Sequence, residues 1–120
     1  MTTIKSYRDL ETWRKAMDLV EEVYKESKPF PKEEAYGLTG QMRRAAVSVP
    51  SNIAEGQGRD STKEFLHHLS FAYGSLCELQ TQLLLACRLG YLSQQAYDHL
   101  EDSSSCVARL INGLSNSLRR

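Results

Sequence analysis

The sequence has almost nothing that a secreted, membrane or metal-binding protein needs. The segment from Met1 to Ser6 has no apolar core, and no apolar run approaches the roughly 20 residues of a membrane-spanning helix. The three cysteines, Cys77, Cys87 and Cys106, have no zinc-site spacing. The first two are ten residues apart on one predicted helix, which separates them by roughly 15 Å, too far for a disulfide. These absences predict a cytoplasmic protein with reduced thiols.

Net charge is also missing, because 15 basic residues balance 15 acidic ones. A chain without an overall positive field is not a simple non-specific nucleic-acid binder, although this leaves a local basic patch open. Strand-like alternation, internal repeats and low-complexity segments are absent as well. At 120 residues, the chain is predicted to form one domain, residues 1–120.

The sequence does contain four stretches with helical periodicity. The first begins near Ser6, a predicted cap, and ends at Lys28. We expect its core face to be the stripe at heptad spacing formed by Leu10, Trp13, Met17, Val20 and Tyr24. The others cover about residues 38–55, 61–89 and 93–118. Their predicted core faces are the apolar positions at helical spacing: Met42, Ala45, Ala46, Val49 and Ile53 on the second; Phe65, Leu69, Ala72, Leu76, Leu79, Leu83 and Ala86 on the third; and Leu100, Val107, Ile111, Leu114 and Leu118 on the fourth. Because short connections join the four helices, the predicted fold is all-α, an antiparallel up-down-up-down four-helix bundle.

The second stretch has an interior proline. No charged residue occurs from Ala45 to Ala54, so its outer face is not predicted to be a solvated one. Pro50 removes a backbone donor and crowds the preceding turn, which predicts that the second helix is kinked at this residue. Glycines at positions 56 and 58 end the helix, and Ser61-Thr-Lys-Glu64 is typical of a capping box that opens the next one.

The third stretch lacks a charged face, since Glu78 is the only charged residue between Ser70 and Cys87. Such a helix is expected to be covered on every side, which a four-helix monomer of this size cannot do. A second copy of the chain would supply the cover, so the sequence predicts a homo-oligomer. The predicted oligomer interface consists of Ser70, Gly74, Cys77, Thr81 and Leu85.

Four basic residues around the second helix are candidate nucleic-acid contacts: Arg43, Arg44, Arg59 and Lys63. The structural alternative is that one of these arginines forms a salt bridge that holds helices together. Asn52 and Glu55 are a candidate polar lock or ligand site. Their spacing of three puts them on one helical face, and a buried glutamate would need a partner, which Arg43 or Arg44 of a neighbouring turn or chain could supply.

No catalytic constellation is found, so the chain is predicted not to be an enzyme. His67 and His68 are adjacent and point about 100° apart on a helix, which excludes a shared metal. Small helical-bundle ribonucleases use an arginine followed by four to six residues and a histidine. Arg59 precedes His67 by seven intervening residues and narrowly fails that pattern. No glycine loop for phosphates, cofactor motif or small-molecule site is evident.

The segment Gln41-x-Arg-Arg-Ala-Ala-x-Ser-x-Pro-Ser-Asn-Ile-Ala-Glu-Gly56 resembles the signature of the four-helix-bundle proteins related to the 23S ribosomal RNA intervening-sequence protein. Further matching motifs, in chain order, are Leu10-Glu-Thr-Trp13, Phe30-Pro31, Tyr36-Gly37-Leu38, Gly74-Ser75-x-x-Glu78-Leu79 and Leu89-Gly90-Tyr91-Leu92. The resemblance implies a helical bundle that assembles into a homopentamer, has a role around RNA and has no catalytic site.

The resulting functional hypothesis is a non-enzymatic oligomeric module that binds RNA or a nucleoprotein partner. Bundles similar to this family also act as accessory subunits of a reverse transcriptase in retroelements, which favours a nucleoprotein adaptor. The alternatives are a small helical-bundle ribonuclease and a purely structural assembly that recruits a protein.

Overall fold

The computed structural model describes residues 6–120, most of which belong to four long helices. In chain order these are α1 (Glu11–Ser27), α2 (Leu38–Gln57), α3 (Thr62–Arg88) and α4 (Gln94–Leu118). Two 3₁₀ turns, η1 (Tyr7–Asp9) and η2 (Lys32–Glu34), precede α1 and α2. No strand occurs among these residues, so the prediction of an all-α four-helix bundle is confirmed.

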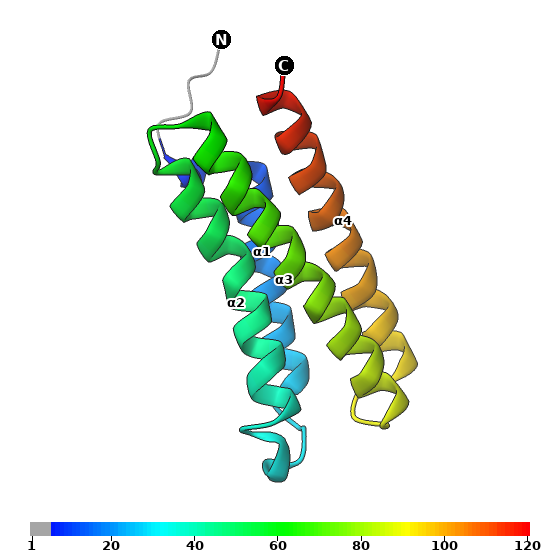
Figure 1. The fold of residues 1–120 in the computed structure, drawn as a ribbon. Coiled ribbons are helices and arrows are strands. Elements are labelled where there is room, and N and C mark those ends of the chain that lie inside the picture. Colours follow the sequence, from blue (N-terminus) through cyan, green and yellow to red (C-terminus); the bar gives the residue numbers. More distant parts are fainter. Residues whose placement is uncertain (1–5) are drawn as a thin grey trace.

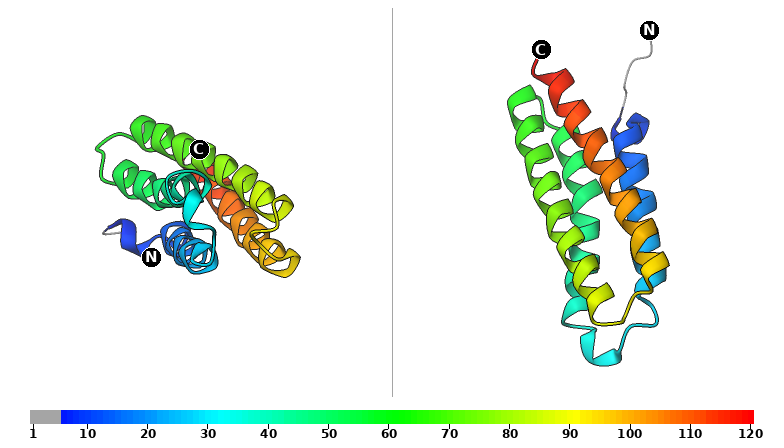
Figure 2. Two further views of the ribbon diagram at one scale, coloured as in Figure 1. Left: turned by 90° about the horizontal axis from the view of Figure 1, so that it is seen from below. Right: turned by 90° about the vertical axis from the view of Figure 1, so that its right-hand side faces the viewer.

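Successive helices run in opposite directions along a molecule of 46 × 25 × 19 Å (Figure 1). Each helix packs against two others: α2 contacts α1 and α3, and α4 contacts α3 and α1. Within the described chain the diagonal pairs, α1 with α3 and α2 with α4, lie farther apart, with no two Cα atoms within 8 Å. The connection between α1 and α2 projects beyond the α3–α4 turn at the same end of the bundle (Figure 2).

Serine side chains cap the starts of α3 and α4 as predicted, and a third serine caps a different element from the one expected. The hydroxyls of Ser61 and Ser93 accept hydrogen bonds from the backbone N–H groups three residues on, at 3.2 and 3.0 Å. Ser6 also forms a capping box, with Asp9, but it caps the η1 turn instead of α1. Leu10 is extended, and α1 begins only after it. The predicted cap of the first long helix was therefore wrong by one element.

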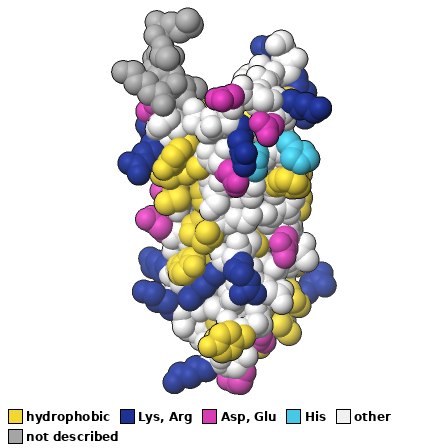
Figure 3. Space-filling view, turned by 60° about the vertical axis from the view of Figure 1, so that its left-hand side comes forward, with side chains coloured by type: hydrophobic (Ala, Val, Ile, Leu, Met, Phe, Trp, Pro, Cys, Tyr) yellow, Lys and Arg dark blue, Asp and Glu magenta, His cyan; other side chains and the backbone are white. Residues whose placement is uncertain are grey.

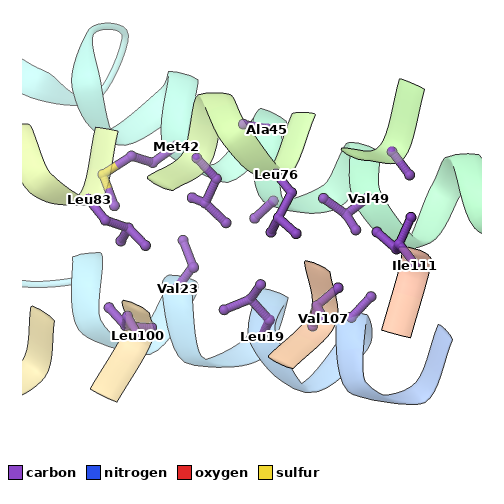
Figure 4. Close-up of a cluster of buried hydrophobic side chains, with 14 of the residues drawn as sticks. Leu19, Val23, Met42, Ala45, Val49, Leu76, Leu83, Leu100, Val107 and Ile111 are labelled. Atoms are coloured by element: carbon purple, nitrogen blue, oxygen red, sulfur yellow. The ribbon is translucent and has the colours of Figure 1, made fainter. Parts of the chain in front are cut away.

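The interior is a continuous cluster of aliphatic side chains from all four helices (Figure 4). The predicted α3 seam is confirmed, with only its first member, Phe65, half-buried: Phe65, Leu69, Ala72, Leu76, Leu79, Leu83 and Ala86. The apolar face of α2 is buried as predicted: Met42, Ala45, Ala46, Val49 and Ile53. On α4, Leu100, Val107 and Ile111 are buried, and the seam closes with partly buried leucines near the C-terminus.

The predicted core stripe of α1 is wrong by about a quarter of a turn. The helix buries Thr12, Ala16, Leu19, Val23 and Ser27. Of the expected stripe only Leu10, which precedes the helix, is buried in the core. The others lie beside the buried face: Trp13 and Val20 are half-buried, and Met17 and Tyr24 are 38% and 40% exposed. Buried indole N–H and phenol O–H groups need hydrogen-bond partners, which this aliphatic interior does not offer. The smaller side chains therefore face the core, and the larger ones lie at the surface.

Pro50 is buried inside α2, which continues as one helix on both sides of it. The kink at this residue stays a prediction. None of the helices in residues 6–120 is both long and apolar enough to cross a membrane.

Candidate functional site

A row of polar side chains connects α2 with α3. The hydroxyl oxygens of Ser48 and Ser75 are 2.8 Å apart. Asn52 Nδ2 donates to the Ser48 carbonyl oxygen at 2.9 Å and lies 3.0 Å from Ser48 Oγ. On its other side, Asn52 Oδ1 lies 3.2 Å from His68 Nδ1. The row links α2 and α3 through half-buried groups, so its hydrogen bonds fix how far one helix is shifted along the other.

The orientation of the Asn52 amide determines the tautomer of His68. Both amide hydrogens are directed at Ser48, so Oδ1 can only accept a hydrogen bond. His68 Nδ1 must carry a hydrogen, and in the neutral ring Nε2 keeps its lone pair. His68 lines a hollow of about 390 Å³ with Lys63, Glu64 and His67. A neutral His68 therefore brings a hydrogen-bond acceptor to the first turns of α3.

The two members of the predicted polar lock do not share one environment. Asn52 is half-buried against α3, whereas Glu55 is exposed and pairs with Arg59 at 3.2 Å. A buried glutamate could have found Arg43 or Arg44 of a neighbouring turn or chain; within the described chain the partner of the exposed Glu55 is Arg59 instead. An exposed ion pair four residues apart on a helix stabilises by only about 0.3–0.5 kcal/mol. Asn52 is thus placed to lock the helices, and Glu55 is not.

Arg43 ties α2 to the end of α1. Its Nε donates to Ser27 Oγ at 3.0 Å and its Nη2 to the Tyr24 carbonyl oxygen at 3.3 Å. The guanidinium also lies over the Tyr24 ring, 4.6 Å from its centroid. Cations are favourable at a helix C-terminus, where carbonyl groups lack partners. The structural alternative for an arginine in this cluster therefore fits Arg43, although hydrogen bonds and ring stacking take the place of the expected salt bridge.

The structure does not bring the four basic candidates together. Arg44 lies in the first half of α2, and Arg59 and Lys63 lie around the α2–α3 turn. Fifteen residues separate Arg44 from Arg59, so the two groups are roughly 20 Å apart along the helix. Arg44 and Lys63 are exposed. They are the candidates with the most freedom to contact a phosphate, because Arg43 and Arg59 already have partners.

The predicted interface residues all lie on the exposed outer face of α3: Ser70, Gly74, Cys77, Thr81 and Leu85. The Thr81 hydroxyl donates to the Cys77 carbonyl oxygen at 3.0 Å, so it has no unmet hydrogen bond. A side chain at Gly74 would meet no atom within 4 Å. Tyr73 and Leu84 beside this stripe are also partly exposed. No element among residues 6–120 covers this face.

A second exposed apolar surface was not foreseen. It is a groove between α1 and α2, of about 300 Å³, lined by Tyr7, Trp13, Met17, Val20, Val47, Pro50, Ser51 and Ala54. We call it the α1–α2 groove. In Figure 3, hydrophobic side chains run down this side of the molecule, with several Lys and Arg side chains gathered below them. The signal in the sequence was the misplaced heptad stripe of α1, which lines the groove.

One hydrogen bond ties the two connections at the lower end of the bundle together. Tyr91 Oη donates to Glu34 Oε2 at 3.0 Å, and Phe30 packs against the Tyr91 ring. This hydrogen bond, followed by burial, raises the pKa of Tyr91 above its ordinary value. Deprotonation would remove the donor. The contribution to folding stability is therefore full below the ordinary tyrosine pKa and is lost as the pH rises through the raised one.

In the part of the chain that the structure describes, no three His, Cys, Asp or Glu side chains are grouped to hold a metal ion. His67 and His68 both pack against the Phe71 ring, with centroid distances of 4.5 and 6.1 Å. His99 Nε2 lies 3.2 Å from Glu22 Oε2 and links α4 to α1. The histidines thus make ring contacts, the contact of His68 with Asn52 and the contact of His99 with the Glu22 carboxylate.

Comparison with known proteins agrees with this architecture. No curated protein matches the sequence. A solved structure from Bacteroides thetaiotaomicron, described as a protein of unknown function from the S23 ribosomal protein family, has a TM-score of 0.80. The match covers 88% of this chain and 95% of that one at 18% identity, so it shows the shared fold. The sequence model of the 23S rRNA-intervening sequence proteins matches residues 8–113. The chain therefore belongs to the 23S rRNA-intervening sequence protein family.

Proposed function

We propose that this protein is a non-enzymatic cytoplasmic scaffold that assembles with copies of itself and binds RNA or a nucleoprotein partner. The observation that carries this proposal is the outer face of α3. It is exposed in the single chain, and Glu78 is its only charged residue between Ser70 and Cys87. Burying apolar surface stabilises by about 25 cal/mol per Å², so a helix-long face favours association.

A ring of five copies is proposed from the family resemblance, because helical periodicity gives no copy number. A contact between two different surfaces of the chain can close into such a ring, which covers the face in every copy. Leaving the face in water would favour aggregation instead.

The RNA part of the proposal is supported by the family description and by two exposed cations. Arg44 and Lys63 are too few to hold RNA firmly from a single copy of a chain with no net charge. In a ring the pair repeats in every subunit, and linked weak sites bind far more tightly than one. The proposed affinity therefore depends on assembly.

A ribonuclease remains the second candidate, favoured by one observation. Asn52 orients His68 so that Nδ1 donates, and in a neutral ring Nε2 would then be the acceptor that a general base requires. The position of Arg59 argues against a ribonuclease. Arg59 is paired with Glu55 and lies before α3, whereas the ribonuclease pattern needs an unpaired arginine on the helix that carries the histidine. Loss of RNA cleavage in His68→Ala, with cleavage by the parent protein, would establish the enzyme and overturn the scaffold.

RNA binding is tested with the double variant Arg44→Ala, Lys63→Ala. We expect weaker binding of single-stranded RNA and a flatter dependence of log K on log salt, by about 0.7 for each lost phosphate contact. Fluorescence anisotropy across a salt series measures both quantities. The control is Lys15→Ala, Arg109→Ala, which removes the same charge from exposed positions elsewhere and should bind like the parent.

Equal binding by both double variants, or no binding by the parent protein at low salt, would contradict the RNA part of the proposal. Such a result would favour a protein partner over RNA.

A further inference from the structure

The chain has two exposed apolar surfaces, and they belong to helices at opposite corners of the bundle. One is the outer face of α3, and the other is the α1–α2 groove. We propose that the α1–α2 groove of one copy receives the outer face of α3 from the next copy. This inference rests on the self-assembly proposed above and names both surfaces that carry it.

The shape of the α1–α2 groove suits the packing of another helix. Trp13, Met17 and Val20 line the groove, and Tyr24 lines the adjoining hollow. The four recur at steps of four, three and four residues, the spacing at which one helix packs its side chains against another. Eleven residues separate the first from the last, about 16 Å at the helical rise. Val47, Pro50 and Ala54 of α2 line the other side. A partner helix would thus contact two helices at once.

The outer face of α3 has the same spacing as the α1 stripe, and its side chains are complementary to that stripe in size. Ser70, Gly74, Cys77 and Thr81 also recur at steps of four, three and four residues over the same eleven-residue length. These side chains are small, whereas those on α1 are large. Small side chains let a neighbouring helix approach closely, so large residues of α1 can pack between them. The leucines beside them, Leu84 and Leu85, would add apolar contact at one end.

The charges fit as well. No charged side chain lines the groove itself, and Arg43 lines the adjoining hollow at its lower end. The facing surface has one charge between Ser70 and Cys87, the carboxylate of Glu78. A neutral groove with a basic end therefore meets a neutral face with one acidic group. An acidic partner helix from another protein would have to place its charges against an uncharged floor, at a desolvation cost.

The heights of the two surfaces favour a closed ring. Tyr24 of α1 lies beside Arg43 of α2, and Ser75 of α3 lies beside Ser48 of α2. Along the long axis of the bundle, Tyr24 and Ser75 therefore differ in height by five residues of α2, about 7.5 Å. α1 and α3 run in the same direction at diagonal corners of the bundle, with no two Cα atoms within 8 Å (Figure 1). A neighbour related by rotation about the long axis would bring the two stripes together in parallel, with little shift along the axis. Rotation without a large shift produces a ring and not an open filament.

The test uses one substitution on each surface. Met17→Arg puts a charge into the groove, and Gly74→Arg puts a long side chain onto the outer face of α3. Both positions are exposed, and an added side chain at Gly74 meets nothing within 4 Å, so both subunits should keep their helical circular dichroism. Asp102→Arg, at an exposed position of α4, is the control that should assemble like the parent protein.

Each variant alone is expected to sediment as the 13.6-kDa monomer. An equimolar mixture should form a heterodimer of twice that mass, because Gly74→Arg keeps an intact groove and Met17→Arg keeps an intact α3 face. One such contact lacks the avidity of a closed ring, so the mixture is measured at about 100 µM.

The outcomes separate this inference from the proposed function. A monomeric parent protein would overturn self-assembly as a whole. A parent protein that assembles together with an equally assembled Met17→Arg would leave self-assembly standing and overturn the role of the groove. Two monomeric variants whose mixture stays monomeric would show that the two surfaces do not bind each other.

Discussion

Leu83→Ala should lower the free energy of unfolding by about 2–5 kcal/mol, since it leaves a cavity in the centre of the bundle. Leu83 is fully buried in the core cluster that also contains Met42 and Val23 (Figure 4). Such a loss is a large part of the stability of a domain of this size. Urea denaturation followed by circular dichroism, at one fixed protein concentration, measures it.

The matched control is Leu85→Ala, two residues further along the same helix. Leu85 is 46% exposed and lies on the proposed interface, so its truncation should cost the subunit less than about 1 kcal/mol. It should weaken assembly instead. A small loss in Leu83→Ala would contradict the placement of the core, and equal losses in both variants would contradict the assigned faces of α3.

Gly56→Ala should destabilise the fold by about 1–3 kcal/mol, although alanine is the better helix former. A methyl group at this position would lie 2.7 Å from His68 Cβ and 3.1 Å from Phe65 Cδ1. α2 and α3 approach each other closely here, and the helices would have to separate. The same movement would strain the hydrogen bond between Asn52 and His68.

The control for this substitution is Gly113→Ala, inside α4 and away from both proposed contact surfaces. An added methyl group there meets nothing within 4 Å, so the subunit should gain about 0.5–1 kcal/mol. Thermal unfolding of the two variants side by side gives the comparison. A neutral Gly56→Ala would mean that the two helices are less closely packed than the structure shows.

Much of the fold follows from the sequence because helical periodicity is a local signal. The seams of α2 and α3 each offer one apolar face, so Ile53 and Leu79 were correctly placed in the core. α1 offers two faces at similar spacing. Choosing between them requires knowing which side chains its neighbours can accommodate, and Ala16 fits where Trp13 does not. That information lies in other helices, so periodicity alone gave the wrong face.

The polar contacts were harder to predict for the same reason. Asn52 and His68 are sixteen residues apart, and their contact depends on the register between α2 and α3. The partner of Glu55 was nearby in sequence, at Arg59, and the local spacing of four could have identified it. The groove between α1 and α2 needed both the true core face of α1 and its neighbour helix. It could only be recognised after the fold was known.

Sedimentation equilibrium of the unmodified protein at micromolar concentration tests self-assembly most directly. The expected result is a single species of about five times the 13.6-kDa chain mass, unchanged over a tenfold dilution because a closed ring is held at every interface. A different closed number would contradict the pentamer and leave the scaffold standing. A species of 13.6 kDa would contradict the scaffold itself, since both apolar surfaces would then be stable in water.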